Sequence, residues 1–103
     1  MPLFAGKDDY VELESSDEKK SKVPIAIEKI NEYSDSDRIQ RKAREGTIML
    51  VRVKELRERN VGELKRCVER IKRTVEASGG EMVAVGEDWI IVTPGSAKIV
   101  RPD

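Results

Sequence analysis

The sequence has no histidine, a single cysteine and aromatic residues at only 4% of its 103 positions. With Cys67 as the sole thiol, a zinc or iron–sulfur site, a disulfide framework and a catalytic centre of the Ser-His-Asp or Cys-His type are all excluded. No apolar run approaches the roughly 18 residues that a membrane-spanning helix needs, and the start lacks the apolar core of a secretory signal. We therefore expect a protein without metal or cofactor, in a reducing cytoplasmic compartment where a cysteine stays unpaired.

Acidic and basic residues number 20 each and make up 39% of the chain, whereas the amide side chains are limited to Asn31, Gln40 and Asn60. A composition rich in charge and poor in amides is typical of proteins from heat-adapted organisms. The length suits one domain, whose small core gains stability from self-association.

Residues 1–22 are predicted to form a flexible arm, and residues 23–103 a folded domain. The arm begins with an apolar tip at Met1, Leu3 and Phe4. It continues as a polar stretch with too few apolar side chains to offset its ordering entropy. So short a tip would bind a lipid surface weakly by itself, and better when a dimer presents two copies of it.

Hydrophobic periodicity in the domain predicts the element order β-α-β-α-β-β-β. The predicted strands span residues 23–28, 47–53, 82–85, 89–93 and 97–100, and the predicted helices span residues 38–44 and 60–78. The second helix has the stronger signals, because Asn60 is a good N-cap with Glu63 as its capping-box partner, and Gly79 follows the helix end.

This order predicts an α/β fold of the α+β sandwich type, with a five-stranded mixed sheet and both helices on one face. The predicted strand at 47–53 is apolar on both of its faces, as expected for an inner strand. Because two helices cover only one face, the other face needs a partner. A second copy of the chain is the simplest partner, so we predict a homodimer.

Few side chains suggest catalysis. The acidic pairs lie in the arm, at a helix cap and in the hairpin turn at 86–88, where capping or solvation explains them. The glycines at 79–80 belong to a turn and not to a phosphate-binding loop, and Cys67 lies beside the apolar stripe of its helix as a packed thiol. We expect no enzymatic activity.

Basic residues concentrate between Arg38 and Arg73, where 13 of them accompany five acidic residues. Such a surface suits an acidic peptide, anionic lipid head groups or nucleic acid, and it is equally typical of a solvated helix. Trp89, the only tryptophan, also has two interpretations: a core side chain, or an anchor at a binding surface.

The C-terminal third carries the most distinctive pattern. Gly79–Met82 has the sequence Gly-Gly-Glu-Met, and Gly86–Pro94 has the sequence Gly-Glu-Asp-Trp-Ile-Ile-Val-Thr-Pro. This pattern resembles the SepF family of cell-division proteins, in particular its archaeal branch. A looser similarity extends back through the predicted helix at 60–78 and the predicted strand at 47–53, and the resemblance covers about 80 residues. The resemblance implies a cytoplasmic adaptor that dimerises and binds the C-terminal tail of the tubulin-like FtsZ. An N-terminal segment would attach it to the inner face of the cell membrane at the division site.

The resemblance also implies which residues bind. In bacterial members the FtsZ tail contacts the hairpin, where an aromatic residue and often a lysine match Ile90 and Ala84, and a glycine tied to self-assembly matches Arg73. The implied tail-binding residues are Ala84, Trp89, Ile90 and Val92. The implied self-association residues are Val68, Ile71, Arg73, Val83 and Val85, and the implied membrane contacts are Met1, Leu3 and Phe4.

Two other functions fit parts of the sequence. A small nucleic-acid-binding dimer of the archaeal Alba type has a similar length and an extended hairpin. The acids of the turn at 86–88 would repel phosphates, however, and a neutral chain does not suit a chromatin role, so nucleic acid is a disfavoured partner. A ligand-sensing regulatory domain is the third alternative, because small βα modules host many functions.

Overall fold

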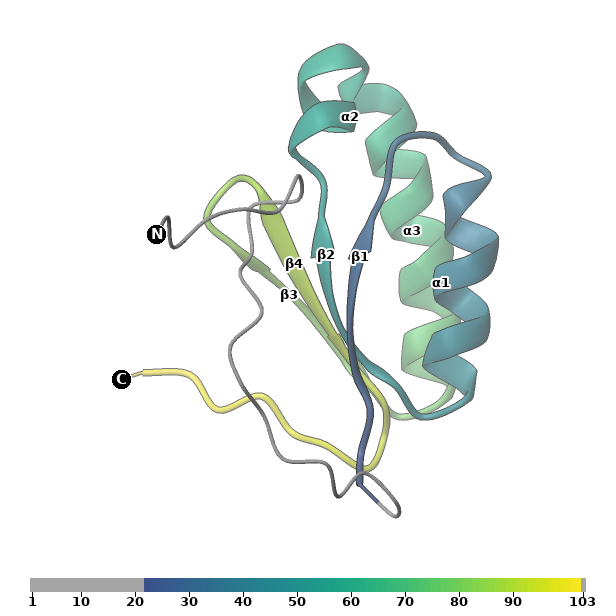
Figure 1. The fold of residues 1–103 in the computed structure, drawn as a ribbon, viewed down its shortest axis with the longest axis vertical. Helices are drawn as coiled ribbons and strands as arrows, with labels where there is room; N and C mark the ends of the chain where they lie inside the picture. The colour runs from purple at the N-terminus through teal and green to yellow at the C-terminus, as the bar shows by residue number, and fades with distance from the viewer. Residues whose placement is uncertain (1–21, 103) are drawn as a thin grey trace, which may run out of the picture.

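A computed structural model of the protein describes residues 22–102, which form a four-stranded sheet with helices on one side (Figure 1). The strands are β1 (Ile25–Lys29), β2 (Ile48–Arg52), β3 (Glu81–Val85) and β4 (Trp89–Thr93). The helices are α1 (Asp35–Arg44), α2 (Lys54–Arg59) and α3 (Val61–Ala77). The predicted alternation of strands and helices, followed by a hairpin, is confirmed, with one helix more and one strand fewer than expected.

The strand order in the sheet is β1-β2-β4-β3. β1 runs parallel to β2, and β4 runs antiparallel to both β2 and β3, so the prediction of a mixed sheet is confirmed. β1 and β3 are the edge strands, and one side of each backbone has no strand partner within residues 22–102.

The predicted strand at residues 97–100 does not form. Ala97 closes a turn by donating its backbone N–H to the carbonyl oxygen of Pro94, at 3.1 Å. The backbone N–H of Ile99 then donates to a side-chain carboxylate oxygen of Glu81, at 3.2 Å, where a strand would pair with backbone. The segment therefore passes the end of β3 without pairing along it, and the prediction of a fifth strand is wrong for the single chain.

Helix α2 has only six residues and is missing from the sequence prediction. Leu56 is its one buried side chain, and a single apolar residue produces no periodicity. At the junction with α3, the Asn60 side chain accepts the backbone N–H of Glu63 at 3.0 Å, which confirms the predicted N-cap. The Glu63 carboxylate does not complete a capping box but accepts the backbone N–H of Tyr33, at 2.7 Å, and so fastens the β1–α1 connection to α3.

Helices α1 and α3 lie side by side on one face of the sheet (Figure 1). α3 turns a stripe of buried residues toward the sheet, namely Leu64, Cys67, Ile71 and Val75. The central strands face this stripe with Met49, Val51, Ile90 and Val92. Cys67 is therefore packed in the core, where burial raises the pKa of its thiol and the nearby charges of Glu63 and Asp35 raise it further.

The two segments that carry the distinctive sequence pattern meet in space. A Cβ atom on Gly80 would lie 2.0 Å from the carbonyl oxygen of Thr93, and a Cβ atom on Gly95 would lie 2.5 Å from the carbonyl oxygen of Ser78. The Thr93 hydroxyl accepts the backbone N–H of Glu81, at 3.2 Å. The pattern thus specifies a close crossing of two backbones, where the chain after α3 passes the end of the hairpin.

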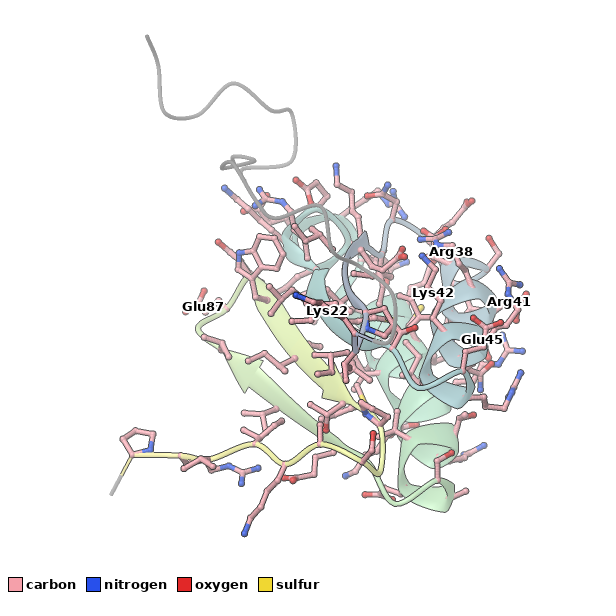
Figure 2. The ribbon with its side chains drawn as sticks, turned by 60° about the horizontal axis from the view of Figure 1, so that its bottom comes forward. Lys22, Arg38, Arg41, Lys42, Glu45 and Glu87 are labelled. Atoms are coloured by element: carbon pink, nitrogen blue, oxygen red, sulfur yellow. The ribbon has the colours of Figure 1, made fainter. Side chains whose placement is uncertain are left out.

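A buried carboxylate joins the edge strand β1 to α1. Glu28 accepts a hydrogen bond from Arg38 Nε at 2.8 Å, and Lys42 Nζ donates to its other oxygen. Arg38 and Lys42 reach from α1 toward β1, whereas Arg41 points away from the sheet (Figure 2). Burial alone raises the pKa of Glu28, but the hydrogen bonds and charges of the two cations outweigh it and leave the pKa below its ordinary value.

Gly80→Ala is expected to lower the free energy of unfolding by about 2 kcal/mol or more, because the added methyl group overlaps a backbone carbonyl that cannot move aside. Gly62→Ala is the matched control: its Cβ meets nothing closer than 3.5 Å, and the change should stabilise α3 by up to about 1 kcal/mol. Urea unfolding of both variants measures the difference. Equal stabilities would show that the crossing tolerates a side chain.

Glu28→Gln is expected to cost about 1–2 kcal/mol of stability at pH 7, because it removes charge-assisted hydrogen bonds from a buried site. The pKa of Glu28 is lowered by folding. Its stabilising contribution is therefore present above the unfolded pKa of about 4.3 and is lost as the pH falls through the folded value.

The difference in unfolding free energy between wild type and Glu28→Gln should accordingly shrink as urea unfolding is repeated from pH 7 toward pH 2. Glu45→Gln, at the exposed end of α1, is the control and should change little at any pH. A difference that stays constant with pH would contradict the role assigned to Glu28.

Candidate protein-binding surfaces

The sheet face that points away from α1 and α3 has no helix over it in the part of the chain that the structure describes (Figure 1). Successive strand residues point to opposite faces, so the core positions Met49 and Val51 assign the alternate positions of each strand to this face. We call these positions the open face. They form three rows across the sheet: Ile25, Ile48, Thr93 and Glu81; Ile27, Leu50, Ile91 and Val83; and Lys29, Arg52, Trp89 and Val85.

The middle row of the open face is apolar on all four strands. In the adjoining rows, the side chains of Ile25 and Val85 are 64% and 49% exposed. A contiguous apolar surface on a small domain marks an interaction site, because its exposure to water is unfavourable. The open face is therefore the first candidate binding surface.

Trp89 lies at one end of the open face and not in the core beneath the helices. The guanidinium carbon of Arg52 is 5.8 Å from the Trp89 ring centroid, and Arg52 Nε is 3.0 Å from Glu55 Oε2. The neighbouring hairpin turn is also held, since Arg57 Nη2 donates to Asp88 Oδ1 at 2.8 Å. Trp89 is thus presented on a braced hairpin, which favours its interpretation as an anchor.

A groove of about 180 Å³ runs between α3 and the edge strand β3. It is lined by Val68, Lys72, Met82, Val83, Ala84 and Ile90. Lys72 is the one charged side chain in this lining; it is 58% exposed, with its Nζ 3.9 Å from Glu76 Oε2. An apolar floor, a cation and a strand edge together suit an extended peptide. This α3–β3 groove is the second candidate surface.

The residues implied for tail binding lie in three places. Ala84 lines the α3–β3 groove, Ile90 belongs to the core with its 9% exposed surface at the floor of that groove, and Trp89 lies on the open face. Val92 is 1% exposed and packs beneath the helices, so the structure assigns it to the core and not to a binding surface.

The residues implied for self-association also separate. Ile71 is 1% exposed and belongs to the core, a correction of the same kind as Val92. Its burial follows from its place in the apolar stripe of α3. The others are Val83 and Val85 on the open face, Val68 in the groove and Arg73, exposed on α3.

Several residues of the two surfaces are absent from the predicted set. Lys72 and Met82 line the groove, and Ile27, Leu50 and Ile91 build the middle row. Strand alternation was a partial signal for the row, because within each strand it separates these side chains from their immediate neighbours on the other face. The sequence carries no sign of which face the helices cover, so the row is not distinguished from the core.

The basic residues between Arg38 and Arg73 do not form one free surface. Arg38 and Lys42 pair with Glu28, Arg52 with Glu55, Arg57 with Asp88 and Arg70 with Asp37. Arg70 also lies over the ring of Tyr33, with its guanidinium carbon 5.3 Å from the centroid. At the hairpin tip, the side chain of Glu87 is 83% exposed. Part of the basic segment is therefore engaged in ion pairs within the folded domain.

Within residues 22–102, no group of acidic, cysteine or histidine side chains is arranged to hold a metal ion. No helix in the same range is long and apolar enough to span a membrane. The predicted membrane contacts at Met1, Leu3 and Phe4 lie outside the described residues.

The chain matches a known family in sequence and known structures in fold. The family described as cell division protein SepF matches residues 25–99 of the chain. A SepF-like protein from Archaeoglobus fulgidus superposes with a TM-score of 0.72 at 23% sequence identity, over 79% of this chain and 96% of that one. A SepF-like protein from Pyrococcus furiosus superposes with a TM-score of 0.67 at 25% identity, over 80% of this chain and 99% of that one. No curated protein matches the chain.

Proposed function

Since the chain belongs to the SepF family of cell-division proteins, we propose that it is an adaptor that dimerises and binds the C-terminal tail of FtsZ. It tethers that tail to the inner face of the cell membrane at the division site. The observation that carries the proposal is an apolar open face beside a separate groove on an edge strand. Two protein-binding surfaces on one small domain are what an adaptor requires.

The open face suits a second copy of the chain. A flat sheet packs against another flat sheet at about 10 Å, with interdigitated side chains. A two-fold axis between two copies sets the same apolar rows against each other, so the open face of each copy is buried by the open face of the other. Five of the six groove residues lie on α3 or on the helix side of the sheet, and Val83 alone also belongs to the open face, so most of the groove stays accessible in such a dimer.

The α3–β3 groove suits the FtsZ tail. Ile90 and Ala84 occupy the positions at which bacterial members carry an aromatic residue and often a lysine, and both line the groove. Lys72 reaches the same groove from α3 and supplies the ammonium group that Ala84 lacks. Met82 adds apolar surface beside Ile90, and the free edge of β3 offers backbone hydrogen bonds to an extended tail.

The membrane link in this proposal depends on the apolar tip at Met1, Leu3 and Phe4. One such tip binds a lipid surface weakly, because few apolar groups enter the bilayer. A dimer presents two tips, and the second binding event then benefits from a high effective concentration. Dimerisation and membrane attachment therefore support each other.

Leu50→Asp is expected to abolish the dimer, because it sets two charges against each other in the middle of the apolar row. Sedimentation equilibrium of the full chain measures this, and circular dichroism verifies that the variant is folded. Val61→Asp, an equally drastic change at an exposed position on α3, is the control and should leave the dimer intact. A dimer that survives Leu50→Asp would show that the chains associate through another surface.

Lys72→Glu is expected to weaken binding of the FtsZ tail at least tenfold, about 1.4 kcal/mol, because it reverses the one charge in the groove. Fluorescence anisotropy with a labelled tail peptide from the same organism measures the dissociation constant. Lys65→Glu, exposed on the same helix outside the groove, should change it less than twofold. If the wild-type chain does not bind the peptide at high micromolar concentration, the proposed function fails.

A further inference from the structure

The C-terminal segment, residues 97–102, leaves the sheet on the side opposite the helices (Figure 1). It has the sequence pattern of a strand, yet no strand in the described part of its own chain pairs with it. Val100 is 84% exposed, more than any other large apolar side chain in residues 22–102. Exposure of this side chain to water is unfavourable, and a neighbouring apolar surface would remove that cost.

The segment is held where it leaves its own chain. The backbone N–H of Ile99 donates to Glu81 Oε2 at 3.2 Å, and Arg101 Nη2 lies 3.4 Å from Glu81 Oε1. Val100 lies between these two contacts, and its side chain is exposed. A mobile tail would expose its side chains at random, whereas this one presents a single valine from a held backbone.

Glu81 itself belongs to the open face, at the β3 end of a row. The segment that it holds is thus continuous with the surface that a second copy would cover. Within residues 22–102 the segment pairs with no strand, and the side chain of Val100 stays 84% exposed.

We propose that residues 97–102 of each chain pack on the open face of the second copy, with Val100 as the principal apolar contact. This inference rests on the dimer proposed above and adds an exchanged element to it. The absent fifth strand is then explained, because the segment finds a neighbouring sheet only when the second chain is present. The two chains would exchange their C-terminal segments, and the contacts with Glu81 would set the direction in which each segment leaves its own chain.

Isotope-filtered NMR on the full chain tests the exchange directly. Chains with labelled methyl groups are mixed with unlabelled chains, unfolded and refolded together, and filtered nuclear Overhauser effects are recorded from the methyl groups of Val100. Contacts from Val100 to open-face protons of the unlabelled chain are expected. If the chain is a dimer but Val100 contacts only its own chain, the inference is overturned while the proposed dimer stands. If sedimentation shows a monomer, both the proposed dimer and the proposed exchange of residues 97–102 are contradicted.

Val100→Asp provides an energetic test. It is expected to raise the dimer dissociation constant about tenfold, as for the loss of one well-buried valine contact. Val61→Asp again serves as the matched control, since it places the same charge at an exposed valine in the helix layer. Equal dissociation constants for Val100→Asp and the wild type would contradict a contact by Val100 in the dimer.

Discussion

The two long helices cover one face of the four-stranded sheet, and both faces of this sheet carry apolar side chains. α1 and α3 enclose the face that carries Met49 and Val51, while the middle row across the other face has the same apolar character and no helix over it within the described chain. In layered folds each apolar face is buried against another element. In the proposed dimer, each chain supplies half of a larger sandwich, and the second copy provides the layer that covers the open face.

The same arrangement separates the two proposed interactions. The open face lies on one side of the sheet, and the α3–β3 groove lies on the helix side of its edge. The two surfaces share only Val83, so a partner in the groove and a second copy on the open face would contact largely different residues. The edge position of β3 is what allows this, because an inner strand would have neither a free backbone nor a groove beside it.

The sequence predicts those elements whose signals are local. Asn60 and the stripe from Leu64 to Val75 define α3, and the hairpin follows from two apolar runs around a short turn. α2 is missed because Leu56 alone gives no period. The strand order, and hence the side of Val92 and of Leu50, depends on pairing between distant segments. Alternation separates Leu50 from Met49 and Val92 from Ile91 within their own strands, without saying which side chain of each pair the helices cover.

The family pattern and the binding chemistry are carried by different residues. The backbone crossing is formed by Gly80, Thr93 and Gly95, and it leaves no room for a Cβ atom on either glycine. Substitution of these glycines would therefore destabilise the fold itself and not only a binding surface. The groove lining has no such constraint: a cation can come from β3 or, as Lys72 does here, from the adjoining helix. The family match over residues 25–99 therefore identifies the fold and the family, whereas in the proposed function the preference for a particular tail depends on the side chains around the groove.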